Sequence, residues 1–222
     1  MMLIKTLKSH SGFIYPYLAY LVVGGIFLLN VNRAESHEIL NQFFWAPLHP
    51  FFAYITHLGD GLTLAIVAAI LLMLNFRATI FMALSGMLAG GITQFLKHQF
   101  FDDVVRPVFY FNHFHPGEFM PQVVPGVQTL IHNSFPSGHS TASFAMFCTL
   151  AMITRRPSFR VIFFFAALII AYSRVYLSQH FFVDTYVGSF IGISGTLIIY
   201  HLLQWLENRY SIQWWYKSLI NR

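Results

Sequence analysis

The last of three short polar stretches in this apolar sequence carries residues suited to nucleophilic chemistry. It runs from Ser173 to Asp184 and reads Ser-Arg-Val-Tyr-Leu-Ser-Gln-His-Phe-Phe-Val-Asp. His180 precedes Asp184 by four positions, so the two side chains are expected to share a face if a helix begins near Ser178. A carboxylate that accepts the imidazole N–H fixes the tautomer and leaves the other ring nitrogen basic, as a nucleophile requires. The alternative interpretation is a histidine whose polar atoms are satisfied at a helix start.

The second stretch, Pro136-Ser137-Gly138-His139, predicts the start of a helix. Its proline suits a first helical turn because φ is fixed and no N–H is present, and Asn133 or Ser134 is then the cap. The three N–H groups that follow the proline are expected to converge at the positive end of the helix, which makes an anion site. Gly138 lets a ligand approach the backbone closely, and His139 is placed to donate a proton to a leaving group.

Three cations complete the set: Lys97 and Arg106 in the first stretch, residues 97–107, and Arg174 in the last. The arginine fork matches phosphate oxygens bidentately, whereas lysine acts as a point charge. Taken singly, each cation could extend to lipid headgroups. Together with two histidines and a helix N-terminus, they predict a pocket for a dianionic tetrahedral group. Phosphoryl transfer depends mainly on positioning and charge stabilisation, and this inventory meets that demand without a metal.

The composition places these residues in an integral membrane protein. Of the 222 residues, 56% are hydrophobic and only 9% are charged. The single cysteine, Cys148, excludes a disulfide framework and a C-x-x-C metal or redox site. The net charge of +5 comes from dispersed residues that form no continuous basic stripe, so nucleic-acid binding is not expected.

Six apolar segments are predicted to cross the membrane as helices, a crossing that takes about 20 residues. They are residues 13–31, 61–76, 78–96, 137–153, 159–172 with its flanks, and 184–206. The first is longer than the apolar region of a signal peptide, about 7–15 residues. Prolines and histidines interrupt residues 38–58, which favours an interfacial segment. The predicted fold is therefore an all-α polytopic membrane protein with one domain, 1–222, and a motif-bearing core at about 97–206.

The distribution of positive charge predicts the orientation of these spans. With six spans and a cytoplasmic N-terminus, nine of the thirteen basic residues lie inside: Lys5, Lys8, Arg77, Arg155, Arg156, Arg160, Arg209, Lys217 and Arg222. Arg33 lies outside, and so do the three cations of the polar stretches. A further span at residues 43–58 would instead move the 155–160 arginines outside. We therefore expect both termini in the cytoplasm and all three polar stretches on the outer face.

The three stretches resemble the motifs of the type 2 phosphatidic acid phosphatase (PAP2) superfamily. Its pattern is Lys-x6-Arg-Pro, then Pro-Ser-Gly-His, then Ser-Arg-x5-His-x3-Asp. The second and third blocks match at every named position, whereas eight residues rather than six separate Lys97 from Arg106. The resemblance covers about the last three-fifths of the chain by motif, and the first spans only by architecture.

The resemblance implies a role for each matching residue. His180 would form a phosphohistidine, with Asp184 as its orienting partner, and His139 would protonate the leaving group and then activate water. The phosphate oxygens would be held by Arg106, Ser137, Gly138, Arg174 and Lys97.

The resemblance also implies a membrane phosphatase acting on lipid phosphates or diphosphates. In bacteria its site would face the periplasm from the inner membrane, and candidate substrates are undecaprenyl diphosphate, phosphatidylglycerol phosphate, phosphatidic acid and lipid A. A lipid phosphotransferase with the same intermediate and a non-catalytic lipid transporter or scaffold are the alternatives. Related haloperoxidases hold vanadate in this pocket, but those proteins are soluble.

No metal or other cofactor is expected, and protein partners are open. A metal site formed by the histidines at 113, 115 and 132 is not favoured, because no further ligand occurs at a familiar spacing, so they are interpreted as loop residues.

Overall fold

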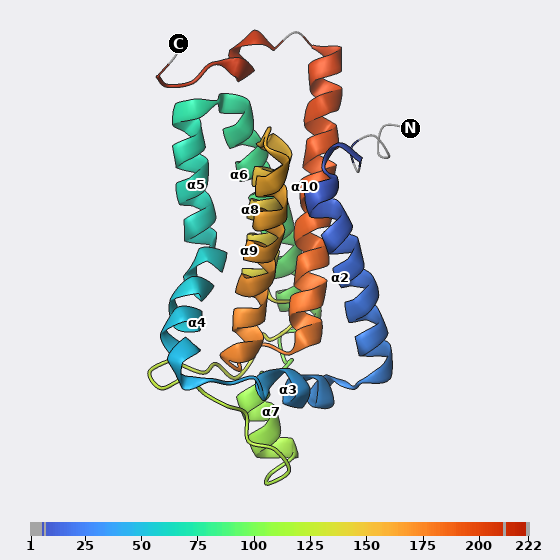
Figure 1. Cartoon of the computed structure of the whole chain (residues 1–222), viewed down its shortest axis with the longest axis vertical. Helices are drawn as coiled ribbons and strands as arrows, with labels where there is room; N and C mark the ends of the chain where they lie inside the picture. The colour runs from blue at the N-terminus through green and yellow to red at the C-terminus, as the bar shows by residue number, and fades with distance from the viewer. Residues whose placement is uncertain (1–5, 7, 211, 221–222) are drawn as a thin grey trace.

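The computed structural model describes residues 6, 8–210 and 212–220, and it contains helices and connecting loops but no β-strand among them (Figure 1). The predicted all-α class is confirmed. The α-helices are α2 Ser11–Asn30, α3 Arg33–Asn41, α4 His49–Ile55, α5 Gly61–Leu74, α6 Phe76–Phe100, α7 Pro107–Phe114, α8 Gly138–Ile153, α9 Pro157–Tyr176 and α10 Phe182–Arg209. Short 3-10 turns are η1 Ala46–Leu48, η2 Thr56–Gly59 and η3 Gln213–Tyr216.

Local capping sets several helix starts. Asn75 accepts a hydrogen bond from the Ala78 N–H and caps α6, and Pro157 occupies the first turn of α9. The prediction that Asn133 or Ser134 caps α8 is wrong, because Ser137 holds the N-cap position and the helix begins one residue later. The proline therefore precedes the helix and does not enter its first turn.

Four of the described helices, α2, α6, α9 and α10, are long and apolar enough to cross a membrane. A fifth crossing arises if residues 46–59 and α5, which meet at a bend of 61°, are counted as one span. The predicted interfacial segment, residues 38–58, is divided: α3 lies across one end of the bundle, and α4 leads into α5 (Figure 1). Helices α5 and α8 have only 14 and 16 residues, so the predicted count of six spans stays a prediction.

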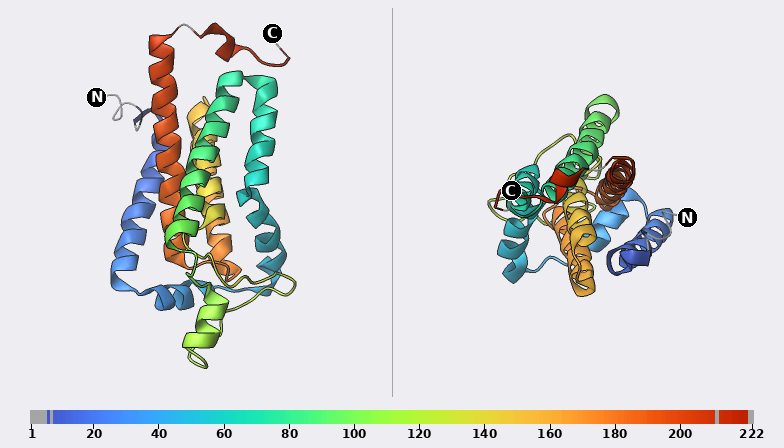
Figure 2. Two further views of the ribbon diagram at one scale, coloured as in Figure 1. Left: turned by 180° about the vertical axis from the view of Figure 1, so that it is seen from behind. Right: turned by 90° about the horizontal axis from the view of Figure 1, so that it is seen from above.

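Helix α8 is the centre of the bundle and packs against α6, α9 and α10. Two glycines of α10 let it approach α8 closely. A Cβ at Gly188 would lie 2.6 Å from the Ser137 carbonyl oxygen, and one at Gly192 would lie 2.5 Å from the Thr141 carbonyl oxygen. Close packing here holds the start of α8 against the first turn of α10. Seen from behind, α6 lies between α10 and α5 (Figure 2).

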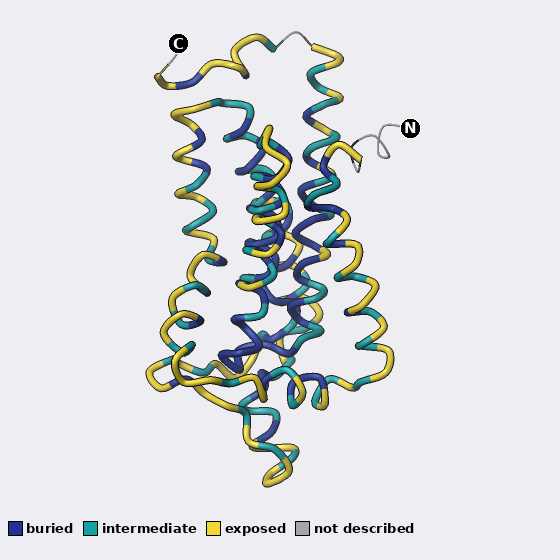
Figure 3. Tube along the Cα trace, in the orientation of Figure 1, coloured by how far each residue is buried: buried dark blue, intermediate teal, exposed yellow. Residues whose placement is uncertain are grey.

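The outer faces of the bundle are apolar and exposed, as expected of helices that face lipid. Figure 3 shows exposed positions along the outer sides of α2 and α5. They include large aliphatic side chains: Val22, Val23, Ile26, Leu29, Leu62, Ile66, Ile70 and Leu74. This arrangement supports a membrane protein.

The polar stretches gather at one end of the bundle, together with α3 and α7 (Figure 1). The α5–α6 and α8–α9 turns, where the arginines predicted to be cytoplasmic lie, are at the opposite end. Arg77 there forms a two-bond ion pair with Glu207 of α10. The polar stretches and the turns that carry these arginines therefore lie at opposite ends of the bundle.

Candidate active site

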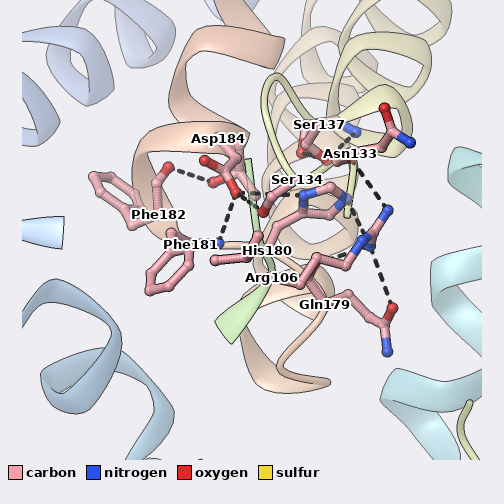
Figure 4. Close-up of polar contacts among 12 residues, drawn as sticks. Arg106, Asn133, Ser134, Ser137, Gln179, His180, Phe181, Phe182 and Asp184 are labelled. Carbon is pink, nitrogen blue, oxygen red and sulfur yellow. Dashed lines mark hydrogen bonds and ion pairs between the residues drawn. The ribbon is translucent and has the colours of Figure 1, made fainter. Parts of the chain in front are cut away.

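Two loop segments run side by side and bring the first polar stretch to the site. The Arg106 N–H donates to the Ile131 carbonyl at 2.8 Å, and the Ser134 N–H donates to the Val104 carbonyl at 2.9 Å. Arg106 then contacts Gln179 in the turn between α9 and α10, and Ser134 contacts Asp184 in the first turn of α10. Figure 4 shows Arg106 and Asp184 on opposite sides of the His180 ring.

His180 lies in that turn and is 2% exposed. The expectation that a helix beginning near Ser178 carries both His180 and Asp184 is wrong, because α10 begins at Phe182. The two side chains still approach each other, with His180 Nδ1 at 3.5 Å from Asp184 Oδ2. This separation is longer than a hydrogen bond, so Nδ1 has no hydrogen-bond partner in the described structure.

Asp184 is fully buried and is held mainly by other groups. Its Oδ2 accepts hydrogen bonds from the Ser134 hydroxyl at 2.5 Å and from the Phe181 N–H at 3.0 Å. The carboxylate is thus fixed beside the imidazole by the chain on either side of it. It faces Nδ1, the nitrogen on which positive charge develops when Nε2 forms a bond.

Arg33 of α3 is a further neighbour of Asp184 that sequence reasoning did not assign to the site. Its Nη2 lies 3.8 Å from Asp184 Oδ1 and donates to the Val105 carbonyl at 3.0 Å. The guanidinium carbon lies 3.9 Å from the centre of the Phe181 ring. The available signal was that Arg33 is the one outer cation that belongs to no polar stretch.

Arg106 contacts the other nitrogen of His180. Its Nη1 lies 3.4 Å from His180 Nε2 and donates to the Gln179 carbonyl at 3.0 Å, while its Nε–H donates to the His132 carbonyl at 2.9 Å. Burial lowers the pKa of His180 well below its usual value, and the positive charge of Arg106 lowers it further. His180 is therefore neutral near pH 7, as a nucleophile must be.

Arg174 and Lys97 add two more buried cations, 7% and 8% exposed. Arg174, near the end of α9, donates from Nη1 to the Thr56 hydroxyl at 2.7 Å, and its Nε has no partner in the described structure. Both charges also lower the pKa of His180, so both lie within electrostatic reach of the ring. Helix α6 continues to Phe100 before the chain turns back to Arg106, which accommodates the eight-residue spacing of Lys97.

The start of α8 differs in part from the predicted anion site. The Ser137 N–H donates to the Asp184 carbonyl at 3.0 Å, so it is not free for a ligand. The Ser137 hydroxyl accepts from the Ser140 N–H at 3.4 Å as the helix cap. A Cβ added at Gly138 would meet nothing within 4 Å. The prediction of three converging N–H groups is therefore wrong for Ser137, while the space in front of Gly138 is open.

His139 has an acidic partner from another part of the chain. Its Nε2 lies 2.7 Å from Asp60 Oδ1, and Asp60 Oδ2 lies 3.1 Å from His57 Nδ1. Asp60 immediately precedes α5. The only sequence signal near this pair is an aspartate and a glycine before an apolar run, which is typical of a helix cap.

Two cavities meet at His139 and Asp60. One, of about 530 Å³, is lined by polar side chains that include Thr56, Arg174 and Gln179. The other, of about 570 Å³, is an apolar groove between α5, α6 and α8. A ligand at the junction therefore has a polar side and an apolar side available at the same time.

Of the loop histidines, His132 contacts the site through its carbonyl, which accepts from Arg106, while the side chains of His113 and His115 make separate interactions. The His113 ring stacks on Phe109, and His115 Nδ1 lies 2.8 Å from Glu118 Oε2. Within residues 6, 8–210 and 212–220, no group of three or more histidine, cysteine, aspartate or glutamate side chains is arranged to hold a metal ion.

A protein of known structure and a protein-family model both match this chain. The crystal structure of LpxE from Aquifex aeolicus superposes with a TM-score of 0.62, covering 74% of this chain and 92% of that one at 24% sequence identity, so the two share a fold. No curated protein sequence matches. The model of the PAP2 superfamily matches residues 78–208, more than half of the chain, and includes every residue of the three polar stretches. The protein therefore belongs to the PAP2 superfamily.

Proposed function

We propose that the protein is a membrane phosphatase that hydrolyses a lipid phosphate or diphosphate. The observation that carries this proposal is the junction of two cavities at His139 and Asp60. A phosphate group in the polar cavity would lie next to Arg174, and an apolar chain attached to it would extend along the groove between α5, α6 and α8. Membership of the PAP2 superfamily and the fold shared with LpxE support a phosphatase.

The first chemical step is attack by His180 Nε2 on phosphorus. A P–N bond forms while the P–O bond to the leaving lipid or phosphate breaks, and His139 gives its proton to the leaving oxygen. Asp184, 3.5 Å from Nδ1, stabilises the positive ring. Arg106 turns its donors from Nε2 to the phosphate oxygens as the phosphate enters, because Nε2 must be free to attack.

The second step returns the enzyme to its starting state. Water attacks phosphorus, the P–N bond breaks, and His139 takes the proton from that water. Arg106, Arg174 and Lys97 hold the phosphate oxygens in both steps, together with the N–H of Gly138 and the hydroxyl of Ser137. The buried cations supply the charge stabilisation that a metal ion gives in other phosphatases, so we expect no metal requirement.

The proposed orientation has six spans, cytoplasmic termini, and the site on the periplasmic face of a bacterial inner membrane. The charge of the α5–α6 and α8–α9 turns, which lie opposite the polar stretches, supports it. The apolar groove opens between helices, so a lipid could reach His139 from within the bilayer.

A substrate panel tests the proposal. Purified protein is given undecaprenyl diphosphate, phosphatidylglycerol phosphate, phosphatidic acid or lipid A, one at a time, with glycerol phosphate as the chain-free control. We expect phosphate release from at least one lipid, faster than from the control. No release from any lipid, or equal release from the control, contradicts the proposal. Free phosphate formed from a single lipid also argues against an obligate phosphotransferase.

A further inference from the structure

We infer that Asp60 is a positioning residue for His139, forming a second carboxylate–histidine pair in the site. This inference rests on the proposed function, because it assigns His139 to proton transfer. The pair is shorter than the first one: 2.7 Å separates His139 Nε2 from Asp60 Oδ1, against 3.5 Å between His180 and Asp184. The PAP2 motifs contain no residue from this part of the chain.

The carboxylate of Asp60 is not used as a helix cap, although the residue stands at the N-cap position of α5. An aspartate there normally accepts a hydrogen bond from an N–H of the first helical turn. Asp60 makes no such bond. Its two oxygens lie instead against two imidazole rings, His139 and His57. Helix capping therefore does not explain the orientation of this side chain.

The segment before Asp60 packs tightly against α8 and α9, which fixes the carboxylate. A Cβ at Gly59 would lie 3.0 Å from the His139 carbonyl oxygen and 2.9 Å from Ile170 Cγ2. Thr56 accepts the hydrogen bond from Arg174, and Thr63 donates to the His57 carbonyl at 2.8 Å. The short turn η2 therefore contacts Arg174 through Thr56 and packs against His139 at Gly59, and Asp60 follows directly after it.

The consequence for chemistry is a defined tautomer of His139. When Nε2–H donates to Asp60, Nδ1 is the nitrogen that carries the proton to the leaving oxygen. The negative carboxylate favours the protonated ring that the first step requires, and it opposes burial and the positive charge of Arg174, which lower the pKa of His139 to about 3. The other charged or titratable groups that act on His139 are Arg174, Arg106, His57 and His180, and of the charged groups only Asp60 is negative.

The Asp60→Asn variant tests the inference, because it keeps the shape of the side chain and removes its charge. We expect kcat to fall about 10–100-fold, the loss typical of carboxylates that orient a metal-bound histidine, with KM changed less than about twofold. The alkaline limb of the kcat profile moves to lower pH, because the protonated ring loses its partner. Asp60→Glu restores part of kcat. As a control, Asp103→Asn removes an exposed carboxylate at the end of the bundle where the polar stretches lie, and it leaves kcat and its pH profile unchanged.

An unchanged kcat in Asp60→Asn overturns the inference, and so does a rise in KM alone, which would make Asp60 a substrate contact. A measurement without substrate distinguishes failure of the inference about Asp60 from failure of the proposed function. The NMR signals of the His139 ring nitrogens, identified by their loss in His139→Gln, report the tautomer directly. We expect a single Nε2–H form in the wild type and a mixture in Asp60→Ala. The same signals in both proteins overturn the inference, whether or not any lipid is hydrolysed.

Discussion

The apolar groove offers a sharp test, because two neighbouring glycines of α6 differ in their relation to it. Gly90 lines the groove, whereas Gly91 does not. A Cβ at either position meets nothing within 4 Å, so both positions have space for a side chain to begin. Gly90→Leu places a side chain inside the groove, and Gly91→Leu is the matched control.

The expected loss in kcat/KM follows from the number of methylene groups that the leucine would displace from the groove. The lining residues of α6 extend from Gln94 to Ala83, about 16 Å at a rise of about 1.5 Å per residue. Gly90 lies between them, so a leucine there displaces about four methylene groups of a bound chain. At about 0.8 kcal/mol for each methylene transferred from water, the loss is about 3 kcal/mol, or about 100-fold in kcat/KM.

The assay uses a short-chain lipid phosphate below its micelle concentration, so that the chain is transferred from water and the estimate applies. Phosphate release is measured beside glycerol phosphate, which has no chain. Gly90→Leu should lose about 100-fold on the lipid and nothing on glycerol phosphate, and Gly91→Leu should match the wild type on both. Equal activity of Gly90→Leu and Gly91→Leu on the lipid would refute the placement of the chain in this groove.

Three further outcomes are expected. Burial lowers the pKa of His37 to about 3, so between pH 6.5 and 5 only the unfolded chain binds a proton at His37, and the free energy of unfolding falls by about 2 kcal/mol. The melting temperature should therefore depend less on pH in His37→Gln than in the wild type. An equal pH dependence in the two proteins would contradict this expectation. His180, whose pKa is also lowered, should stay reactive as pH falls through 6.5, so an acidic limb of kcat/KM near pH 6.5 would be evidence against a buried neutral ring. Phosphate release should be unchanged by a chelator such as EDTA, and loss that added Mg²⁺ or Zn²⁺ restores would refute charge stabilisation by the cations alone.

The meeting of the three polar stretches was predictable from sequence, because each stretch directly adjoins an apolar segment. A residue at the end of a membrane span must lie near one surface, and positive charge then decides which ends share a surface. The three polar stretches were therefore expected at the same end of the bundle, where the structure has them.

The start of α10 was not predictable, because the turn before it lacks the usual glycine or proline signal. Ser178 adopts φ of 51°, and the N–H groups of Gln179 and His180 both donate to the Arg174 carbonyl. A serine in this left-handed conformation is uncommon and is held by its surroundings; its hydroxyl donates to the Gln122 carbonyl at 2.6 Å. The contact that supports the turn lies 56 residues away in the chain, beyond the reach of local patterns.

The partners Asp60 and Arg33 were missed for a different physical reason. Each is a single polar residue beside a helix start, where capping or contact with lipid headgroups is an adequate explanation. Only the packing of η2 against α8, and of α3 against α10, shows that these side chains face His139 and Asp184. Such contacts depend on tertiary structure and leave no pattern of spacing.

Nucleophilic attack by His180 would form a phosphohistidine, and trapping this intermediate is the decisive experiment. Purified protein is mixed with a lipid labelled with radioactive phosphate and quenched rapidly in alkali, in which a phosphohistidine survives and a phosphoserine does not. We expect alkali-stable label on the peptide that contains His180, and none in His180→Ala. Label that persists in His180→Ala, or phosphate release by that variant at the wild-type rate, would contradict it.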